Sequence, residues 1–364
     1  MTQELFVGLM SGTSLDGVDA VLADLAGAKP RLLACASVPF DATLRRELLA
    51  LNTRGDNEIE RAALAGNALA GKYATAVGSV LEATGTRADA IRAIGCHGQT
   101  VRHRPERGYT TQIGNPALLA ELTRIRVVAD FRSRDIAAGG QGAPLAPAFH
   151  AAVFADPAED RAVLNLGGIA NLSLLPRAGE VVGFDSGPGN CLLDLWAAHH
   201  LGLAHDAGGN WAAAGRVMPE LLERLLAEPY FALAPPKSTG RDLFNEAWLR
   251  KALRGGEDAQ AVQATLLELT ARSVAAAARS FCPGARRVIV CGGSVKNDAL
   301  MRRLAQLVAP AALEPSDHHG IDPQQVEAAA FAWLAKQALD GKPGNLPSVT
   351  GARGARVLGA VYLP

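Results

Sequence analysis

Residues 8–19 read GLMSGTSLDGVD, a run of small residues between two apolar segments. The pattern predicts a strand, a tight turn and a second strand. Such a turn would present backbone N–H groups and the hydroxyls of Ser11, Thr13 and Ser14 with little side-chain bulk, as the close approach of a polyphosphate requires. The stretch is neither a P-loop nor a Rossmann fingerprint, because it lacks the Gly-Lys-Ser/Thr sequence and continues into a strand. Taken alone, it fits an ordinary hairpin turn equally well.

The composition is that of a globular protein with two domains. The 364 residues are 49% hydrophobic and 20% charged, and they suffice for two substantial cores. Lys and Arg total 36, as do Asp and Glu, so the formal net charge is zero. No overall field therefore favours nucleic acid or an anionic membrane, and we expect neither as a partner.

The sequence shows no pattern of export or membrane insertion. No apolar run reaches membrane-spanning length, and the N-terminal residues lack the basic and apolar regions of a signal peptide. The five cysteines are scattered without CxxC spacing, which indicates free and mostly buried thiols in a reducing compartment. These features favour a cytoplasmic protein.

Strand and helix patterns repeat in the two halves of the chain. In the first half, strands are expected at 5–10, 17–25, 31–38, 91–96 and 126–130, with helices at 41–51, 57–84 and 115–123. In the second half, strands are expected at 162–166, 169–175, 180–185, 287–291 and 356–363, with helices at 190–200, 259–281, 297–307 and 324–340. This shared order indicates a duplicated α/β fold rather than one large α/β domain. The Gly- and Pro-rich segment 132–147 is typical of a functional loop or a hinge.

Two further glycine pairs follow strands of the second half. Gly167 and Gly168 lie between its first two strands, as the first turn does in the N-terminal half. Two hairpin turns in equivalent places could hold a phosphate chain from both sides. Gly292 and Gly293 follow a buried strand and would admit a flat ring, while Asn297 could cap the next helix. Each glycine pair alone also fits a tight connection between two elements. Three glycine sites in this order are more specific evidence for a nucleotide site.

The order of these three glycine sites is similar to that of the actin-like ATPase superfamily, whose members have two duplicated domains. Seven longer stretches together closely resemble the anhydro-N-acetylmuramic acid kinase family over nearly the whole chain. They are GLMSGTSLDGVD (8–19), CHGQTVRH (96–103), ADFRSRDIAAGGQGAPLAP (129–147), NLGGIANLS (165–173), GFDSGPGN (183–190), PPKSTGRDLFN (235–245) and VEAAAFAWLA (326–335). The resemblance implies an α/β fold of two actin-like, ribonuclease H-like domains around a nucleotide cleft. We expect an N-terminal lobe of residues 1–145 and 345–364 and a C-terminal lobe of residues 146–344.

The resemblance implies an ATP-dependent kinase of peptidoglycan recycling. Such an enzyme hydrolytically opens 1,6-anhydro-N-acetylmuramic acid and phosphorylates O6, giving N-acetylmuramic acid 6-phosphate and ADP. Its cofactors would be ATP and Mg²⁺, and the protein would be a homodimer. A kinase for another amino sugar or a hexose, or a non-catalytic ATP-driven switch, are the alternatives. The expected ATP-binding residues are Gly12, Thr13, Ser14, Leu15, Asp16, Gly17, Val18, Asp19, Gly167, Gly168, Gly292, Gly293 and Asn297.

Met10 departs from the pattern of the wider superfamily. Many members carry an aspartate at this place, two residues before the first loop glycine, where it helps to hold Mg²⁺. Here Asp16, Asp19, Asp185 or water would have to do so. We therefore predict no particular metal ligand.

Asp185 ends an expected strand and precedes Ser-Gly-Pro-Gly-Asn, so its carboxylate should point into the cleft beside the second glycine turn. A turn or a helix N-cap is the commonest role of an aspartate at such a place. The resemblance implies instead that Asp185 is the catalytic base, which deprotonates a water that attacks C1. The released O6 would then attack the γ-phosphorus of ATP. One carboxylate suffices for this reaction, whereas a glycosidase needs two.

Four residues are expected to contact the sugar. His97 and Gln99 follow a strand at its C-terminal end, where sites of α/β proteins lie. Arg132, or alternatively Arg134, could pair with the lactyl carboxylate of muramic acid. The resemblance implies that Glu327 also reaches the sugar. The ordinary alternative for His97 and Gln99 is a structural hydrogen bond to the adjacent loop. For the arginine it is a surface salt bridge, and for Glu327 it is a solvent-facing position on a helix.

Two other groups of polar residues are less specific. Lys237, Ser238, Thr239 and Arg241 form a loop that could lie near the nucleotide or the sugar. The clustered histidines have no cysteine or carboxylate at a recognisable ligand spacing, so we do not expect a zinc site.

Overall fold

The computed structural model describes residues 3–12 and 15–364. The chain divides into two compact units: Met1–Val153 and Gln325–Pro364 form unit 1, and Phe154–Gln324 form unit 2. Each unit has its own sheet and its own hydrophobic core. The expected α/β fold is thereby confirmed.

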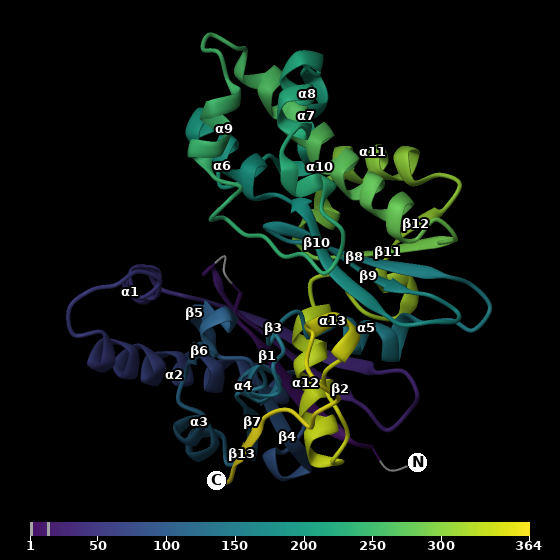
Figure 1. Cartoon of the computed structure of the whole chain (residues 1–364). Coiled ribbons are helices and arrows are strands. Elements are labelled where there is room, and N and C mark those ends of the chain that lie inside the picture. The colour runs from purple at the N-terminus through teal and green to yellow at the C-terminus, as the bar shows by residue number, and fades with distance from the viewer. Residues whose placement is uncertain (1–2, 13–14) are drawn as a thin grey trace. The chain divides into compact units, whose positions relative to one another are not determined.

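Unit 1 is built on a six-stranded sheet with the order β13-β7-β4-β1-β2-β3 (Figure 1). Its strands are β1 (Leu5–Met10), β2 (Gly17–Asp24), β3 (Arg31–Pro39), β4 (Ile91–Cys96), β7 (Val127–Ala129) and β13 (Ala360–Tyr362). The first three form an antiparallel meander, β4 and β7 continue the sheet parallel to β1, and β13 is antiparallel to β7. The strand expected at 356–363 is therefore reduced to its last part, because only 360–362 pair with a neighbour.

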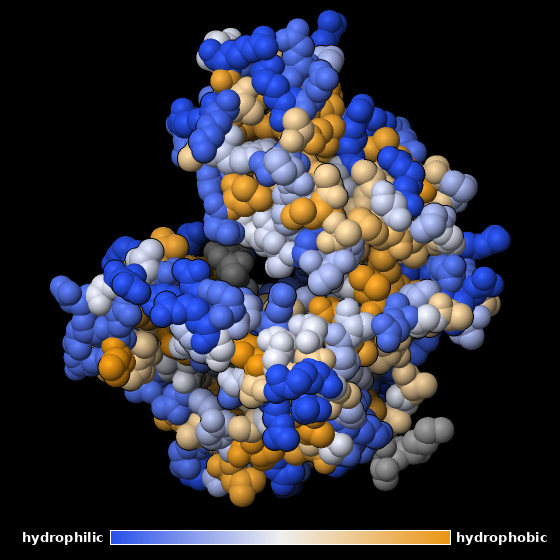
Figure 2. Space-filling view, in the orientation of Figure 1, coloured by the Kyte–Doolittle hydropathy of each residue, from blue (hydrophilic) through white to orange (hydrophobic). Residues whose placement is uncertain are grey.

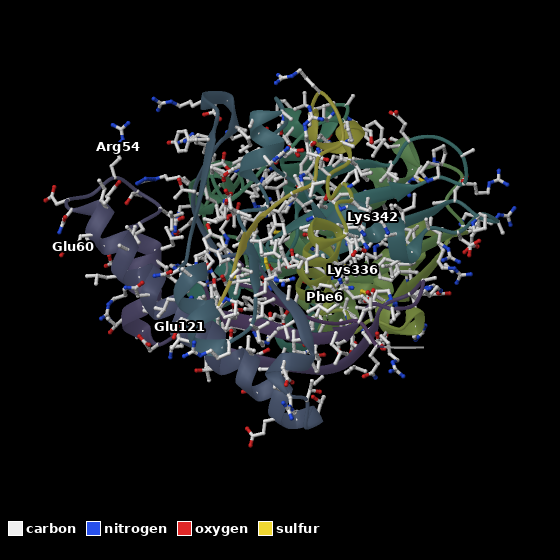
Figure 3. All side chains as sticks on the ribbon, turned by 90° about the horizontal axis from the view of Figure 1, so that it is seen from below. Phe6, Arg54, Glu60, Glu121, Lys336 and Lys342 are labelled. Carbon is white, nitrogen blue, oxygen red and sulfur yellow. The ribbon has the colours of Figure 1, made fainter. Side chains whose placement is uncertain are left out.

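Helices cover both faces of this sheet. The helices of unit 1 are α1 (Ala42–Ala50), α2 (Glu58–Thr84), α3 (Pro116–Thr123), α4 (Ser133–Ala137), α5 (Ala146–Phe154), α12 (Val326–Leu339) and α13 (Pro347–Thr350), and among them α2 packs on one face and α12 on the other. Because strand residues alternate in direction, Val7 and Leu9 belong to the core beneath α2, whereas Phe6 packs with Phe331 of α12. Figure 3 shows Phe6 in the interior, while Arg54 and Glu60 extend outward.

The packing of α12 on the sheet depends on two glycines. A Cβ on Gly8 would lie 1.9 Å from the carbonyl oxygen of Ala328, and one on Gly95 would lie 2.0 Å from that of Phe331. No larger residue fits at either position without moving the helix. This close contact makes α12 part of unit 1, whereas the sequence pattern assigned residues 324–340 to the C-terminal lobe. The boundaries differ because contacts between segments so distant in the chain leave no local pattern.

A hairpin that the sequence analysis did not predict follows β4. It consists of β5 (Gln99–Arg104) and β6 (Tyr109–Ile113), which form a separate two-stranded sheet. Its strand β5 (QTVRHR) contains a single apolar residue, Val101, so the alternation typical of a strand is absent, and the turn at Gly108 is the one local sign of a hairpin.

Unit 2 repeats the strand order of unit 1. Its sheet has the order β10-β9-β8-β11-β12. The strands are β8 (Arg161–Leu166), β9 (Ile169–Leu175), β10 (Val182–Pro188), β11 (Arg287–Cys291) and β12 (Ala312–Pro315). Again three strands form an antiparallel meander and two parallel strands extend the sheet from its first strand. The same arrangement in both units confirms the duplication expected from the sequence.

The helices of unit 2 include α6 (Cys191–Leu201), α7 (Asn210–Ala214), α8 (Pro219–Leu226), α9 (Glu246–Ala252), α10 (Ala259–Phe281) and α11 (Asp298–Val308). Helix α10 is buried along most of its length and contacts α6, α8, α11 and two strands of the sheet. It is the centre of the core in this unit.

The surface of the α1–α2 region in unit 1 is mainly hydrophilic, with apolar side chains in small patches (Figure 2). Ile59 and Leu49 are among its exposed apolar residues. In the described part of the chain, no helix is both long enough and apolar enough to cross a bilayer. All five cysteines are free thiols; Cys96, Cys191 and Cys291 are buried, as expected, whereas Cys35 is exposed.

Candidate active site

The first glycine turn connects β1 and β2, as predicted. Thr13 and Ser14, two of its expected ATP-binding residues, lie outside the described residues. The hydroxyl of Ser11 is buried: it donates to the carbonyl of Gly98 at 3.0 Å and lies 2.8 Å from the hydroxyl of Tyr73. Ser11 is therefore not presented to a ligand, contrary to the expectation, because it joins the turn to the residues after β4.

The other residues of this turn differ in what they expose. The side chains of Leu15 and Val18 belong to the core of unit 1, so only their backbone groups could serve a ligand. Asp16 is exposed. Asp19 accepts a hydrogen bond from Ser37, and burial raises the pKa of its carboxyl group.

Contacts with the end of β4 position the first turn. The side chain of Gln99 donates to the carbonyl of Gly12 at 3.2 Å. The backbone N–H of His97 donates to the carbonyl of Leu9 at 3.1 Å. Gln99 thus shapes the turn directly, which is the structural role that the sequence left open beside sugar binding.

The second glycine turn, Gly167–Gly168, connects β8 and β9 and rests on the beginning of α6. The backbone N–H groups of Gly189 and Cys191 donate to the carbonyl of Gly168 at 3.0 and 3.1 Å, and that of Asn190 donates to Gly167 at 2.9 Å. Three backbone hydrogen bonds therefore fix the shape of this turn.

The third glycine pair follows β11. Gly292 has a φ of +91°, and a Cβ there would lie 2.5 Å from Oδ1 of Asn165, so glycine is required. Next to it, Gly293 is exposed and a Cβ there would meet nothing within 4 Å, which leaves room for a flat ring. Asn297 caps α11 by accepting a hydrogen bond from the N–H of Leu300 at 3.0 Å, which confirms the predicted cap.

Asp185 lies within β10, not at the end of the strand as expected, because the strand continues to Pro188 past an irregularity in its pairing. It caps no helix, since the N-cap of α6 is Asn190. Its Oδ2 atom accepts hydrogen bonds from the hydroxyl of Ser238 and the N–H of Thr239, both at 2.9 Å. Asp185 therefore does not have the structural role of a helix cap.

The surroundings of Asp185 favour a proton acceptor. Burial raises the pKa of its carboxyl group, while the two hydrogen bonds and the charge of Lys237 oppose the rise. The backbone is fixed as well, because the hydroxyl of Tyr230 donates to the carbonyl of Asp185 at 2.8 Å. A carboxylate with a raised pKa is a stronger base than a free aspartate.

Two of the expected sugar-binding residues are in direct contact. Arg132 donates from Nη2 and Nε to Nε2 of His97 at 2.9 and 3.1 Å, and from Nη1 to the carbonyl of Gly142 at 2.8 Å. Burial lowers the pKa of His97 to about 3, with the charge of Arg132 acting in the same direction. Burial also lowers the pKa of Arg132 to about 10, while Glu327 and Asp135 oppose this.

Arg132, rather than Arg134, is thus the arginine placed with His97 and near Glu327. Glu327 occupies the first turn of α12 and is exposed. Asp135, which the sequence analysis missed, is fully buried and accepts hydrogen bonds from Gly142, Asn345 and Thr350. Its partners lie more than 200 residues further along the chain in two cases, so no local signal could have revealed it.

A cavity of about 300 Å³ lies in unit 1 beside His97. Its polar lining includes Gln112, Asn115, Asp130 and Ser133. Among the described residues, no group of three or more His, Cys, Asp or Glu side chains is arranged to hold a metal ion.

The duplicated sheets, each with a glycine turn between its first two strands, define the class of two-domain actin-like ATPases. Component A of (R)-2-hydroxyglutaryl-CoA dehydratase from Acidaminococcus fermentans has the same fold: it superposes with a TM-score of 0.50 at 14% identity, covering 91% of this chain and 98% of that one. At this identity the similarity concerns the fold alone.

The sequence comparison is more specific. The family described as "AnmK: Anhydro-N-acetylmuramic acid kinase" matches residues 4–364. The anhydro-N-acetylmuramic acid kinase of Variovorax paradoxus is 58% identical, with 100% of both chains covered, and that of Nitrosomonas europaea is 53% identical, covering 98% of this chain and 99% of that protein. The chain belongs to the anhydro-N-acetylmuramic acid kinase family. It is therefore an ATP-dependent phosphotransferase of amino sugar and peptidoglycan recycling, as the sequence motifs indicated.

Proposed function

We propose that Asp185 activates the water that opens the 1,6-anhydro bridge. The observation that carries the proposal is the placement of both hydrogen-bond donors, Ser238 and Thr239, on Oδ2. Within the described residues Oδ1 receives no hydrogen bond, so it is available to take a proton. The raised pKa of this carboxyl group suits a general base.

The bonds of the proposed reaction balance with one carboxylate. The water oxygen attacks C1 as Asp185 takes its proton, and the bond from C1 to O6 breaks. O6 then attacks the γ-phosphorus, and the bond from that phosphorus to the β,γ-bridging oxygen breaks. The products are N-acetylmuramic acid 6-phosphate and ADP, and the proton on Asp185 passes to solvent. Attack opposite the leaving oxygen inverts C1.

We propose that the three glycine sites bind ATP. The backbone groups of 12–19 and of Gly167 and Gly168 would contact the phosphates, and the open backbone at Gly293 would admit the adenosine. Mg²⁺ fits this arrangement as an ion held mainly by phosphate oxygens and water, because Asp19 and Asp185 already accept hydrogen bonds from neighbouring side chains. Bound there, it would neutralise phosphate charge.

The free donors of Arg132 support its role in binding the lactyl carboxylate. Three of its five N–H groups are used on His97 and Gly142. Within the described residues, one N–H on each terminal nitrogen is left over, and such a pair can bind a carboxylate with two parallel hydrogen bonds. Glu327, whose charge acts on Arg132, would accept a hydrogen bond from a sugar hydroxyl or amide. We also propose that the enzyme acts as a homodimer in the cytoplasm.

Isotope labelling tests the proposed bond changes. The reaction is run in ¹⁸O-water, and the product is analysed by mass spectrometry before and after phosphatase treatment. Label on C1 and none in the phosphate is the expected result. Label in the phosphate would mean that water attacks phosphorus, which would overturn the mechanism.

A further inference from the structure

We propose that Arg241 binds the ATP phosphates at the second glycine turn and neutralises part of their charge. This inference rests on the proposed position of the phosphates beside Gly167 and Gly168. It assigns a role to the polar loop at residues 237–241, which the sequence left open.

The position of the guanidinium group carries the inference. A Cβ built on Gly168 would lie 3.6 Å from Nη2 and 3.7 Å from Nε of Arg241, and 3.9 Å from Oδ1 of Asn190. The edge of the guanidinium group that carries these two donors therefore lies directly against the turn. A phosphate at the turn would be within reach of this fork, which matches phosphate geometry.

Arg241 also lacks a compensating partner. Within the described residues, its guanidinium group makes no hydrogen bond and no ion pair. Three buried or half-buried arginines of unit 2 differ: Arg161, Arg287 and Arg303 each pair with a carboxylate at 2.6–2.9 Å. An unpaired cation beside a glycine turn is suited to an anionic ligand.

The charge of Arg241 acts on Asp194 of α6. Burial raises the pKa of Asp194 to about 6, and the charges of His205 and Arg241 oppose that rise. The two side chains thus influence each other without forming an ion pair. Arg241 keeps its donors for a ligand.

The same loop holds the proposed base. Ser238 and Thr239 donate to Asp185, and Lys237 donates to the carbonyls of Tyr230 and Phe231 at 3.3 and 3.4 Å. The loop continues into a turn in which the N–H of Phe244 donates to the carbonyl of Gly240 at 3.0 Å. Because so few residues separate Asp185's partners from Arg241, the loop fixes the base and the phosphate contact relative to each other.

Charge neutralisation of this kind is needed here. Phosphoryl transfer depends mainly on positioning and electrostatic stabilisation, and a well-placed arginine contributes about 10³–10⁵-fold in enzymes that use one. Met10 stands where many members of the superfamily carry a metal-binding aspartate. A fixed cation at the second turn would supply stabilisation that does not depend on that carboxylate.

Calorimetry with the full-length protein tests the assignment. Binding of ATP, ADP and adenosine is measured for the wild type, Arg241→Gln and Arg241→Lys. We expect Arg241→Gln to weaken ATP and ADP binding about tenfold or more, with adenosine binding unchanged, and Arg241→Lys to fall in between. Arg250→Gln is the matched control, because Arg250 is exposed on α9 of the same unit and pairs with Glu246.

Equal ADP affinities for the wild type and Arg241→Gln would overturn the inference. If Arg241→Gln does not fold, the test is made with Arg241→Lys alone. The ratio of ADP affinity to adenosine affinity must then be lower in Arg241→Lys than in the wild type. The proposed role of Asp185 as the base is tested by a different variant. Loss of ADP affinity in Arg241→Gln together with normal turnover of Asp185→Asn would support Arg241 and reject the base.

Discussion

Arg132 donates two hydrogen bonds to Nε2 of His97, at 2.9 and 3.1 Å. Since arginine can only donate, Nε2 must be an acceptor and the neutral imidazole carries its proton on Nδ1. Burial lowers the pKa of His97 to about 3, and the charge of Arg132 acts in the same direction, because protonation of Nε2 would place two cations against each other. The fold therefore keeps this histidine neutral.

The neutral state of His97 predicts an acid-sensitive fold. Because its pKa in the folded chain lies below the ordinary 6.5, the unfolded chain binds the extra proton. The contribution of neutral His97 to the free energy of unfolding is complete above about pH 6.5 and is lost as the pH falls toward 3. Between pH 7 and 5 this contribution decreases by about 2 kcal/mol. His150, buried with a pKa of about 3, acts in the same direction.

Urea denaturation at pH 7 and 5 measures this effect. His97→Gln keeps an acceptor for Arg132 and should lose less stability on acidification than the wild type. His318→Gln, at an exposed position, should behave as the wild type does. An unchanged pH dependence in His97→Gln would show that this histidine titrates normally.

The contact of α12 with the sheet predicts that Gly95 cannot be replaced. Gly95→Ala should destabilise the protein by about 3 kcal/mol or prevent folding, because its Cβ would lie 2.0 Å from the carbonyl oxygen of Phe331. Gly78→Ala on α2 is the control: a Cβ there meets nothing within 4 Å, so a gain of up to about 1 kcal/mol is expected. The midpoints of urea unfolding measure the stability of the two variants. Equal midpoints would contradict the close packing of α12 on the sheet.

Asp135 predicts a positioning effect on sugar binding. It accepts from the N–H of Gly142 at 2.7 Å, and the carbonyl of Gly142 accepts from Arg132. Asp135→Asn replaces one acceptor by a donor, so stability should fall by about 1–3 kcal/mol. The KM for the sugar should rise, while the affinity for ATP stays the same.

Asp206→Asn separates positioning from stability. Asp206 accepts from the N–H groups of Trp211 and Ala212, both at 2.9 Å, in unit 2. This variant should lose comparable stability without a change in the KM for the sugar. Equal KM values for both variants would mean that Asp135 acts on stability alone.

The donor pair of Arg132 predicts substrate selectivity. An anhydro sugar without the lactyl group should be a poor substrate, since a charge-assisted pair of hydrogen bonds is lost. Arg132→Gln should reduce kcat/KM for the lactyl substrate by about 100-fold or more and leave that of the lactyl-free sugar nearly unchanged. Steady-state kinetics with both sugars measure the ratio. An unchanged ratio would place the carboxylate elsewhere.

Local patterns predicted most of the secondary structure. The strand at 91–96 and the helix at 259–281 have the predicted limits, because the pattern of apolar residues is a local signal. The hairpin at 99–113 was missed because its strands are short and polar. The assignment of α12 to unit 1 could not be predicted, because it depends on contacts with β1 and β4.

The candidate site, too, could be predicted from the sequence only in part. Glycine turns and the acidic residue Asp185 are visible in the sequence, but the partners that shape their chemistry are distant in the chain. Ser238 is 53 residues from Asp185 and Thr350 is 215 residues from Asp135. The burial of the Ser11 hydroxyl likewise depends on Tyr73, which no local pattern connects with the first turn.

The activity of Asp185→Asn tests the central claim most directly. Single-turnover measurements with saturating ATP and anhydro sugar would be combined with ATP binding by calorimetry, with Asp206→Asn as the control. We predict that Asp185→Asn binds ATP as the wild type does but forms product about 10²–10⁴ times more slowly, because no base activates the water. Product formation at nearly the wild-type rate would contradict the account.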